Sequence, residues 1–416
     1  MNVVIVGPFW FPRGSAASAR ARNLAFGLRD CGARVHVVSM APRAVVPGAT
    51  PAPGIGEHEG ITYECVAPFF VAARGWRDRD QSVPLLRGGW LDKLVWFGGV
   101  YAATPTAVLC LRQLIDRGIC DLVLVYDRSA LRMTPLVRLC RARRVPTVLD
   151  VTEVSEHLRS RLNAIYWDFA VGTRATPRLF DGLTVITSGL ESFYHSRGCA
   201  RTLVLPAIEG WPEPSPWAPT GNPEFRLAYV GSLQPRDAPE VLLEAMRRLA
   251  VEPTRVTLDV VGHYEGTERG RQFARRCASD PTLTRRVRFL GSLSDAALAA
   301  HLASADGLLL TRRDARTEEM SFPTRLVEYL RTGRPVFVSN VGDISRYLSH
   351  GTEAVLLDPG DARKVAAAIA KVALRPDRGA EIGRRGREAG ARHFDRRRHA
   401  ARLLEFAAGL REVLAA

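Results

Sequence analysis

The sequence predicts an α/β protein made of two doubly wound domains, each with a parallel sheet. Short apolar runs that fit buried strands alternate with amphipathic stretches at helical spacing, which is the pattern of parallel α/β units. Near residue 206 this pattern gives way to a stretch rich in proline and tryptophan, and then it starts again. The chain has 416 residues, enough for two domains with large cores. We therefore expect a join near residues 207–225 and a ligand in the cleft between the domains, at the carboxyl ends of the strands.

The first half begins on a predicted buried strand and not on a signal peptide, because no basic segment precedes the apolar run. Residues 94–111 carry no charge but contain two glycines and a proline. A membrane-spanning helix needs ~20 predominantly apolar residues, so we expect a buried or interfacial helix here. The other expected elements are the strands Val3–Val6, Arg34–Ser39, Leu122–Tyr126, Thr147–Val151 and Gly182–Thr187, and the helices Ala17–Cys31 and Thr134–Arg143.

The second half repeats the order of strand, glycine turn and helix, and it ends on a long helix. Its most informative segment is a predicted helix at 322–332, with Ser321 as N-cap, Pro323 in the first turn and Gly333 as the stop. The other expected elements are the helix Ala238–Ala250 and the strands Arg226–Val230, Arg255–Val261, Val287–Phe289, Gly307–Leu310, Pro335–Val338 and Ala354–Leu357.

The N-terminus of the helix at 322–332 is predicted to be an anion site, formed by Ser321–Arg325. Free N–H groups and the positive end of the helix dipole attract negative charge there. Glu328 lies four residues after Thr324, on the same face and ~6 Å further along the axis. This spacing suits a diphosphate at the helix tip and a ribose diol at the carboxylate. The alternative is a capped core helix with a surface glutamate.

The formal net charge is +15, from 58 basic and 43 acidic residues. The basic residues are spread over both halves, without the basic patch and interleaved aromatic residues that are typical of nucleic-acid binding. We therefore expect no nucleic-acid partner, and an anionic small molecule or an anionic membrane surface stays open. The seven cysteines form no CxxC pair, which indicates reduced thiols in a cytoplasmic protein.

A series of motifs follows one another along the chain and resembles a known family. The motifs are Pro12-Arg13-Gly14-Ser15, Gly231-Ser232-Leu233, Val260-Val261-Gly262, Val287-Arg288-Phe289-Leu290-Gly291, Phe322-Pro323-Thr324-Arg325-Leu326-Val327-Glu328, Gly333-Arg334-Pro335-Val336 and Asp358-Pro359-Gly360-Asp361. Their order resembles the retaining glycosyltransferases of the family 4 type, also called glycosyl transferases group 1. The resemblance implies the GT-B fold, with an acceptor-binding domain at 1–207, a donor-binding domain at 208–395, and a C-terminal helix at about 396–416 that returns to the first domain.

The resemblance also implies an activity: transfer of a hexose from a nucleoside diphosphate sugar to a hydroxyl acceptor, with retention and without a cofactor or metal. The acceptor class is a glycan, a lipid-linked molecule or a small molecule. The family's E-x7-E motif ends on a ribose-binding glutamate, which maps onto Glu328. The first glutamate of that motif falls on Met320, and Glu318 and Glu319 lie just beside it, out of register. The family's diphosphate clamp maps onto Arg236, whose guanidinium fork suits two phosphate oxygens. The predicted catalytic residues are Arg236, Glu319 and Asp127, and the predicted donor-binding residues are Gly14, Ser15, Gly231, Ser232, Gly262, Phe289, Ser321, Thr324, Arg325 and Glu328.

Asp127 is chosen because it follows an apolar strand at its carboxyl end, as Asp150 does, with a loop or capping role as the alternative. Further acid–base candidates are Arg128, Glu153 and His157. Asp78-Arg79-Asp80 has the spacing of a metal–diphosphate motif but lies in a charged loop, and no cluster of histidine, cysteine and carboxylate stands at metal-ligand spacing, so no metal site is predicted.

No G-x-G-x-x-G follows the first strand, which argues against a dinucleotide oxidoreductase. Two rival functions stay open: a GT-B sugar-nucleotide epimerase or hydrolase, and a basic protein that binds polyanions or a membrane surface. The expected location is the cytoplasm, with peripheral contact at the inner face of an anionic membrane left open.

Overall fold

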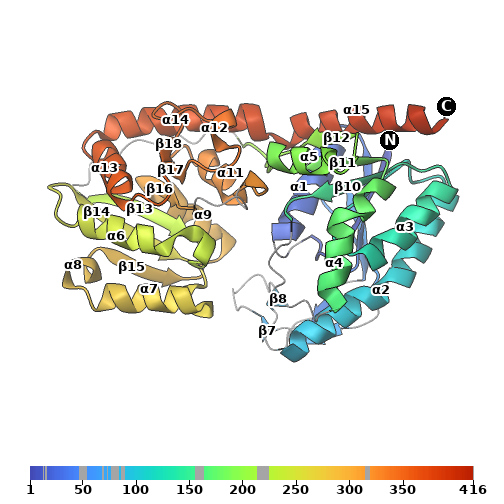
Figure 1. The fold of residues 1–416 in the computed structure, drawn as a ribbon, viewed down its shortest axis with the longest axis horizontal. Coiled ribbons are helices and arrows are strands. Elements are labelled where there is room, and N and C mark those ends of the chain that lie inside the picture. The colour runs from blue at the N-terminus through green and yellow to red at the C-terminus, as the bar shows by residue number, and fades with distance from the viewer. Residues whose placement is uncertain are drawn as a thin grey trace. The chain divides into compact units, whose positions relative to one another are not determined.

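The structure is a computed structural model, and it describes residues 1–12, 14, 16–45, 54–67, 70–72, 74–75, 84–85, 90–154, 164–212, 224–313 and 319–415. By the contacts between Cα atoms the chain divides into two compact units (Figure 1). Unit 1 comprises Met1–Gly210 and Arg396–Ala416, and unit 2 comprises Trp211–Asp395. The C-terminal segment of the chain therefore belongs to the first unit.

Unit 1 is built on a sheet with the strand order β12-β11-β10-β9-β1-β2-β5-β4, in which only the β4–β5 pair is antiparallel. The strand order reverses at β1, which pairs with β2 on one side and with β9 on the other. The strands are β1 (Asn2–Gly7), β2 (Arg34–Ser39), β4 (Ile55–His58), β5 (Ile61–Cys65), β9 (Leu122–Val125), β10 (Thr147–Val151), β11 (Gly182–Val185) and β12 (Thr202–Val204). Two short pairs stand apart from this sheet: β3 (Arg43–Val45) with β6 (Phe70–Ala72), and β7 (Arg74–Gly75) with β8 (Pro84–Leu85).

Helices α1 and α15 cover one face of this sheet, where they share an apolar core with β1, β2 and β9. At their contact, Gly27 of α1 lies so close to α15 that an added Cβ would stand 2.6 Å from the Arg396 carbonyl oxygen. The helices of unit 1 are α1 (Ala16–Asp30), α2 (Trp90–Asp116), α3 (Ala130–Ala142), α4 (Ala164–Arg174), η1 (Thr176–Leu179), α5 (Ser188–His195) and α15 (Arg396–Ala415). The predicted apolar helix at 94–111 forms part of α2, and no helix in the described residues has both the length and the apolar character needed to cross a membrane.

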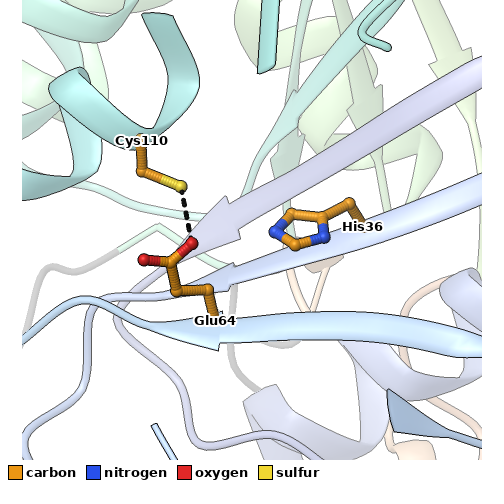
Figure 2. Close-up of side chains that lie close together, drawn as sticks. All are labelled: His36, Glu64 and Cys110. Carbon is orange, nitrogen blue, oxygen red and sulfur yellow. Dashed lines mark hydrogen bonds between the residues drawn. The ribbon is translucent and has the colours of Figure 1, made fainter. Parts of the chain in front are cut away.

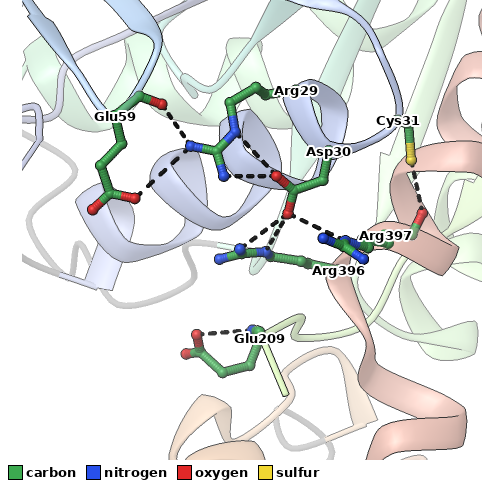
Figure 3. Close-up of polar contacts among 8 residues, drawn as sticks. Arg29, Asp30, Cys31, Glu59, Glu209, Arg396 and Arg397 are labelled. Atoms are coloured by element: carbon green, nitrogen blue, oxygen red, sulfur yellow. Dashed lines mark hydrogen bonds and ion pairs between the residues drawn. The ribbon is translucent and has the colours of Figure 1, made fainter. Parts of the chain in front are cut away.

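An ion-pair cluster around Asp30 joins the end of α1 to the start of α15 (Figure 3). Arg29 Nη2 donates to Asp30 Oδ1 at 2.6 Å, and Arg396 Nη2 donates to Asp30 Oδ2 at 3.0 Å. Arg397 Nε lies 3.5 Å from the same oxygen. Burial alone would raise the pKa of Asp30, but the hydrogen bond from Arg29 and the charges of Arg396 and Arg29 outweigh it, and the pKa of Asp30 is lowered. The carboxylate thus stays charged and holds the two helices together.

Unit 2 has a wholly parallel sheet with the order β15-β14-β13-β16-β17-β18. One core cluster joins alternate strand residues such as Leu227 and Leu309 to α6, α7 and α13. The strands are β13 (Glu224–Val230), β14 (Arg255–Val261), β15 (Val287–Gly291), β16 (Gly307–Leu310), β17 (Val336–Ser339) and β18 (Val355–Leu357). The helices are η2 (Pro235–Asp237), α6 (Pro239–Leu249), η3 (Tyr264–Gly266), α7 (Glu268–Ala278), α8 (Pro281–Thr284), α9 (Asp295–Ser304), α11 (Thr324–Arg331), α12 (Ile344–Tyr347), α13 (Ala362–Ala373) and α14 (Pro376–Phe394).

These elements confirm the predicted fold class, an α/β chain with two doubly wound parallel sheets. Two local predictions are wrong: the helix expected to begin at Thr134 begins at Ala130, and Ser321 is not the N-cap of the helix at 322–332. The helix is α11, it begins at Thr324, and its N-cap is Pro323 with ψ at 97°. A proline disfavours the helical conformation of the residue before it, so Phe322 cannot open the helix. Gly333 does follow the helix end in the left-handed conformation, with φ at 70°.

Candidate functional site

The strand order of unit 2 reverses at β13, which marks one edge of its sheet as the candidate site. β13 pairs with β14 along its whole length, from Glu224 to Val230, but with β16 only at Leu227 and Ala228. The carboxyl ends of β13 and β16 therefore do not pair with each other. In open parallel sheets, ligands bind outside the carboxyl ends of the strands at this point of reversal.

Tyr329 of α11 accepts a hydrogen bond from the end of β13, where β16 does not pair with that strand. The Val230 N–H donates to Tyr329 Oη at 2.8 Å, and the tyrosine is fully buried. Burial raises the pKa of Tyr329, so the phenol stays neutral and can accept this bond. The contact fixes α11, which carries Glu328 and Arg325, to the end of β13. Sequence analysis missed this role, because an internal tyrosine in an apolar helix face looks like ordinary core.

The turn after β13 depends on glycine at two places. The Gly231 N–H donates to the Val261 carbonyl at 2.9 Å. Gly262 has φ at 128°, and a Cβ on it would stand 2.5 Å from the Gly231 carbonyl oxygen. A side chain at position 262 would thus both strain its own backbone and push the turn at 231–232 away from β14. These predicted donor-binding glycines therefore shape the turn at the carboxyl end of the sheet.

Arg236 lies on η2, directly after this turn, with an exposed side chain. Its guanidinium makes no hydrogen bond or ion pair with any other described residue. The adjacent Asp237 is different: it is buried and forms an ion pair with Arg312 from the end of β16. The Arg236 guanidinium is thus available to a ligand, whereas the charge of Arg312 is already neutralised by Asp237.

The loop after β16 is tied to the loop that carries Arg236. The Arg313 N–H donates to the Arg236 carbonyl at 2.9 Å, and Thr311 Oγ1 donates to the Asp237 carbonyl at 2.6 Å. The Arg313 side chain is itself exposed. A second arginine therefore lies beside Arg236, which sequence analysis missed because the two are 77 positions apart and only the strand order brings them together.

On α11, the first helical hydrogen bond runs from the Leu326 N–H to the Pro323 carbonyl, at 2.9 Å. The N–H groups of Thr324 and Arg325 precede it, at the positive end of the helix dipole. Arg325 also forms an ion pair with Glu328, one turn further along, and both side chains are about one-third exposed to solvent. The helix thus presents amide donors and a positive charge at its tip, with an accessible carboxylate behind them.

The other predicted residues of unit 2 are placed as follows. Ser232 and Ser321 are half-buried, whereas Glu319 is exposed. Phe289 packs against Tyr264 and Phe273, with ring centroids 4.8 Å and 6.0 Å away, so its ring is part of the core cluster. The structure thus brings Gly231, Ser232, Arg236, Gly262 and the α11 residues to one sheet edge, through the contacts of Tyr329, Arg313 and Gly262 given above.

In unit 1, the candidate Asp127 is buried and saturated with donors. Arg132 binds it with two nitrogens, at 2.6 and 2.8 Å, and the N–H groups of Arg128 and Ser129 donate to it at 2.6 and 3.0 Å. Asp150 is buried in the same way, with both carboxylate oxygens 3.0 Å from Arg20. Both acids therefore sit in ion pairs that anchor α1 and α3.

The remaining predicted site residues either contact other residues of unit 1 or lie outside the described residues. Arg128 and Glu153 form an ion pair with each other at 2.9 Å, partly exposed. A Cβ on Gly14 would stand 2.3 Å from Ser18 Oγ, so the turn after β1 packs closely on α1. Ser15, Asp78, Asp80, His157 and Glu318 lie outside the described residues.

Comparison with known proteins gives a match in unit 2. Residues 224–374 match the family described as glycosyl transferases group 1. A D-inositol 3-phosphate glycosyltransferase of Geodermatophilus obscurus is 33% identical over 155 residues, which are 36% of this chain and 33% of the relative. The same enzyme of Thermobispora bispora is 30% identical over 157 residues, 36% of this chain and 36% of the relative. The chain thus spans about a third of the length of the curated relatives it matches.

Solved structures match the whole chain at low identity. Sucrose-phosphate synthase from Thermosynechococcus elongatus has a TM-score of 0.68 at 16% identity, over 99% of both chains. Anabaena HepE in complex with UDP has a TM-score of 0.66 at 14% identity, over 98% of this chain and 100% of that one. A mutant of S. aureus TarM with Fondaparinux, alpha-GlcNAc-glycerol and UDP has 0.66 at 10% identity, over 98% and 100%.

At such identities the structural likeness shows the fold alone, and the likeness to a family lies within unit 2. That match covers the strands and helices that build the candidate site, from β13 to α13. Unit 2 is thus similar to the glycosyl transferases group 1 family, and the chain has the GT-B fold.

Proposed function

We propose that this protein is a retaining glycosyltransferase that moves a sugar from a nucleoside diphosphate donor to a hydroxyl acceptor. The observation that carries the proposal is the edge of unit 2 where Arg236 and the tip of α11 follow neighbouring strand ends, with Glu328 behind the tip. Arg236 is exposed and makes no ion pair with any other described residue. The names of the relatives support a glycosyl donor, and the HepE structures contain UDP and UDP-glucose.

In the proposed donor complex, Arg236 and the N–H groups of Thr324 and Arg325 bind the diphosphate, and Glu328 accepts hydrogen bonds from the ribose hydroxyls. The Arg325 guanidinium orients the Glu328 carboxylate through their ion pair. Arg313 adds a second positive charge beside Arg236. These groups are in place before the reaction, so they stabilise charge without having to reorganise as it develops.

The reaction breaks the bond between the anomeric carbon and the diphosphate oxygen, and forms a bond between that carbon and the acceptor oxygen. Negative charge then grows on the diphosphate, where Arg236 and the helix tip stabilise it. The acceptor hydroxyl attacks from the face that the diphosphate leaves, and its proton passes to a phosphate oxygen. This route keeps the anomeric configuration and asks for no protein nucleophile and no metal.

We assign no proton transfer to Asp127, because four donors already hold its carboxylate. Its geometry favours a structural role at the start of α3. Glu319, which is exposed near the tip of α11, stays our candidate for a contact to the donor sugar. The acceptor site is proposed for unit 1, near Gly14, which follows β1.

The experiment is incubation of the protein with a panel of nucleoside diphosphate sugars, with and without hydroxyl acceptors. We expect one donor to give a new glycoside whose anomeric configuration, read by NMR, equals that of the donor. Release of free sugar at a rate that acceptors do not change would favour a hydrolase, and conversion of the donor into an isomer would favour an epimerase. Binding to anionic vesicles or polyanions without any turnover would favour the non-enzymatic alternative.

A further inference from the structure

Three side chains with metal-ligating atoms meet in unit 1 (Figure 2), whereas the proposed donor site belongs to unit 2. They are His36 on β2, Glu64 on β5 and Cys110 on α2. One ligating atom from each lies within 4.8 Å of the other two. The residues are far apart in sequence, so their approach is a product of the fold and was invisible as a motif.

The sheet register explains why two of them share a face. β2 and β5 are parallel, with His36 beside Thr62 and Val38 beside Glu64. Since alternate residues of a strand point to the same face, His36 and Glu64 are diagonal neighbours there. This is the face opposite to the one that packs on α1, because Val35 and Val37 belong to the α1 core cluster. Cys110 reaches the same face from α2.

The distances suit a small, tightly coordinated cation. Cys110 Sγ donates to Glu64 Oε2 at 3.3 Å. In a tetrahedral zinc site, ligand bonds of about 2.3 Å to sulfur and 2.0–2.2 Å to oxygen place those two atoms about 3.5 Å apart. The imidazole has to approach by about an ångström to join them, which side-chain rotation can supply.

His36 is oriented for this role by its other ring nitrogen. Its Nδ1 lies 2.8 Å from Thr62 Oγ1, so Nδ1–H can donate to the hydroxyl and leave the lone pair on Nε2. Nε2 is buried and makes no hydrogen bond within the described part of the chain. In Figure 2 the ring presents a nitrogen toward the Glu64 carboxylate. A buried imidazole nitrogen without a partner costs free energy, and a cation would satisfy it.

We propose that His36, Glu64 and Cys110 bind one divalent cation of the zinc class. Thiolate, imidazole and carboxylate together suit Zn²⁺ better than Mg²⁺ or Ca²⁺, which prefer oxygen ligands alone. Binding forms bonds from the metal to Sγ, Nε2 and a carboxylate oxygen, and the thiol proton leaves to solvent. A water completes the fourth position. The cation fastens α2 to β2 and β5 of the sheet and has no part in the proposed sugar transfer.

The test is zinc content of the tag-free full chain, measured by mass spectrometry after exposure to excess Zn²⁺ and desalting. We expect about one zinc per chain, lost in Cys110→Ser and in the nearly isosteric Glu64→Gln. The matched control is Cys277→Ser, since Cys277 is also a buried thiol whose pKa is raised by burial to about 12, but it lies in unit 2. This control should keep its zinc.

Cobalt gives a second readout that does not depend on zinc retention. With Co²⁺ in place of Zn²⁺, the wild type and Cys277→Ser should show a thiolate-to-cobalt charge-transfer band, and Cys110→Ser should lack it. Circular dichroism shows which variants remain folded, so a misfolded Cys110→Ser leaves Glu64→Gln to decide. Wild-type protein that retains no zinc would overturn the proposal, as would zinc retention that neither Cys110→Ser nor Glu64→Gln reduces.

Discussion

Replacing Glu328 by glutamine distinguishes two possible roles of this residue: a carboxylate that binds the ribose, and a surface residue that only stabilises its helix. The substitution keeps the shape and helix propensity of the side chain but removes its charge. In the folded protein the carboxylate pairs with Arg325, three residues earlier on α11, and both side chains are about one-third exposed. Such helix-surface pairs contribute about 0.3–0.5 kcal/mol, so the melting temperature should fall by only about 1–2 °C.

The effect on the donor should be larger than the effect on stability. Hydrogen bonds to charged groups contribute about 1.5–3 kcal/mol, against about 1 kcal/mol for neutral pairs. The charge therefore accounts for roughly 0.5–2 kcal/mol of donor binding, which is about 2- to 30-fold in Kd, centred on about tenfold. Glu381→Gln is the matched control: Glu381 also pairs with an arginine three residues away on a helix surface, and its loss should leave the Kd unchanged.

The assay is titration calorimetry with the nucleoside diphosphate and with its 2′-deoxy analogue. The wild type should prefer the ribose form, and Glu328→Gln should lose most of that preference. Freeing Arg325 from its partner changes the affinity for both nucleotides alike, so the ratio isolates the ribose contact. An unchanged preference, together with a large fall in melting temperature, would refute the assignment and make Glu328 a structural residue.

Three further predictions concern charge. Arg236→Ala should lower kcat more than it raises KM, because the charge on the diphosphate grows as the bond breaks. The control is Glu244→Ala, at a partly exposed charged residue of unit 2. An equal loss of kcat in this control would contradict the prediction. Turnover should survive excess EDTA in the wild type and also in Cys110→Ser, which lacks the proposed metal site of unit 1. Loss of turnover that Mn²⁺ or Mg²⁺ restores would contradict metal-independent chemistry. Since the folded-state pKa of Asp30 is lowered from 3.8, its stabilisation should be complete above about pH 4 and lost as the pH falls through the folded value. Urea unfolding should therefore show wild type more stable than Asp30→Asn at neutral pH, with the difference shrinking below about pH 4; a constant difference would contradict the ion-pair cluster.

The fold could be predicted from the sequence because the strands of parallel sheets are buried on both faces. Their near-continuous apolar runs, such as Thr147–Val151 and Arg255–Val261, mark the strands without any alignment. The predicted helix start at 322 is wrong, because a serine two residues before a proline looks like a cap. The restriction that Pro323 places on Phe322 argues for a later start, and the structure confirms it with Pro323 as the N-cap.

The candidate site could be predicted only in part. Glu328 and the helix tip follow from local spacing along one helix, and Arg236 follows from the motif order. Arg313 and Tyr329 do not, because each matters through a hydrogen bond to a residue about 80 to 100 positions away, at Arg236 and Val230. His36, Glu64 and Cys110 could not be predicted as a set either, because only the strand register and the packing of α2 bring them together.

The central claim is that unit 2 binds a nucleoside diphosphate through Arg236 and the tip of α11. Its most direct test is a melting-temperature screen with UDP, GDP, ADP, TDP and CMP. A ligand at a hundredfold excess over its Kd stabilises by about 2.7 kcal/mol, which for a unit of this size is about 5–10 °C. The account predicts such a shift with at least one diphosphate, none with CMP, and a smaller shift in Arg236→Ala. No shift with any of the diphosphates would contradict it.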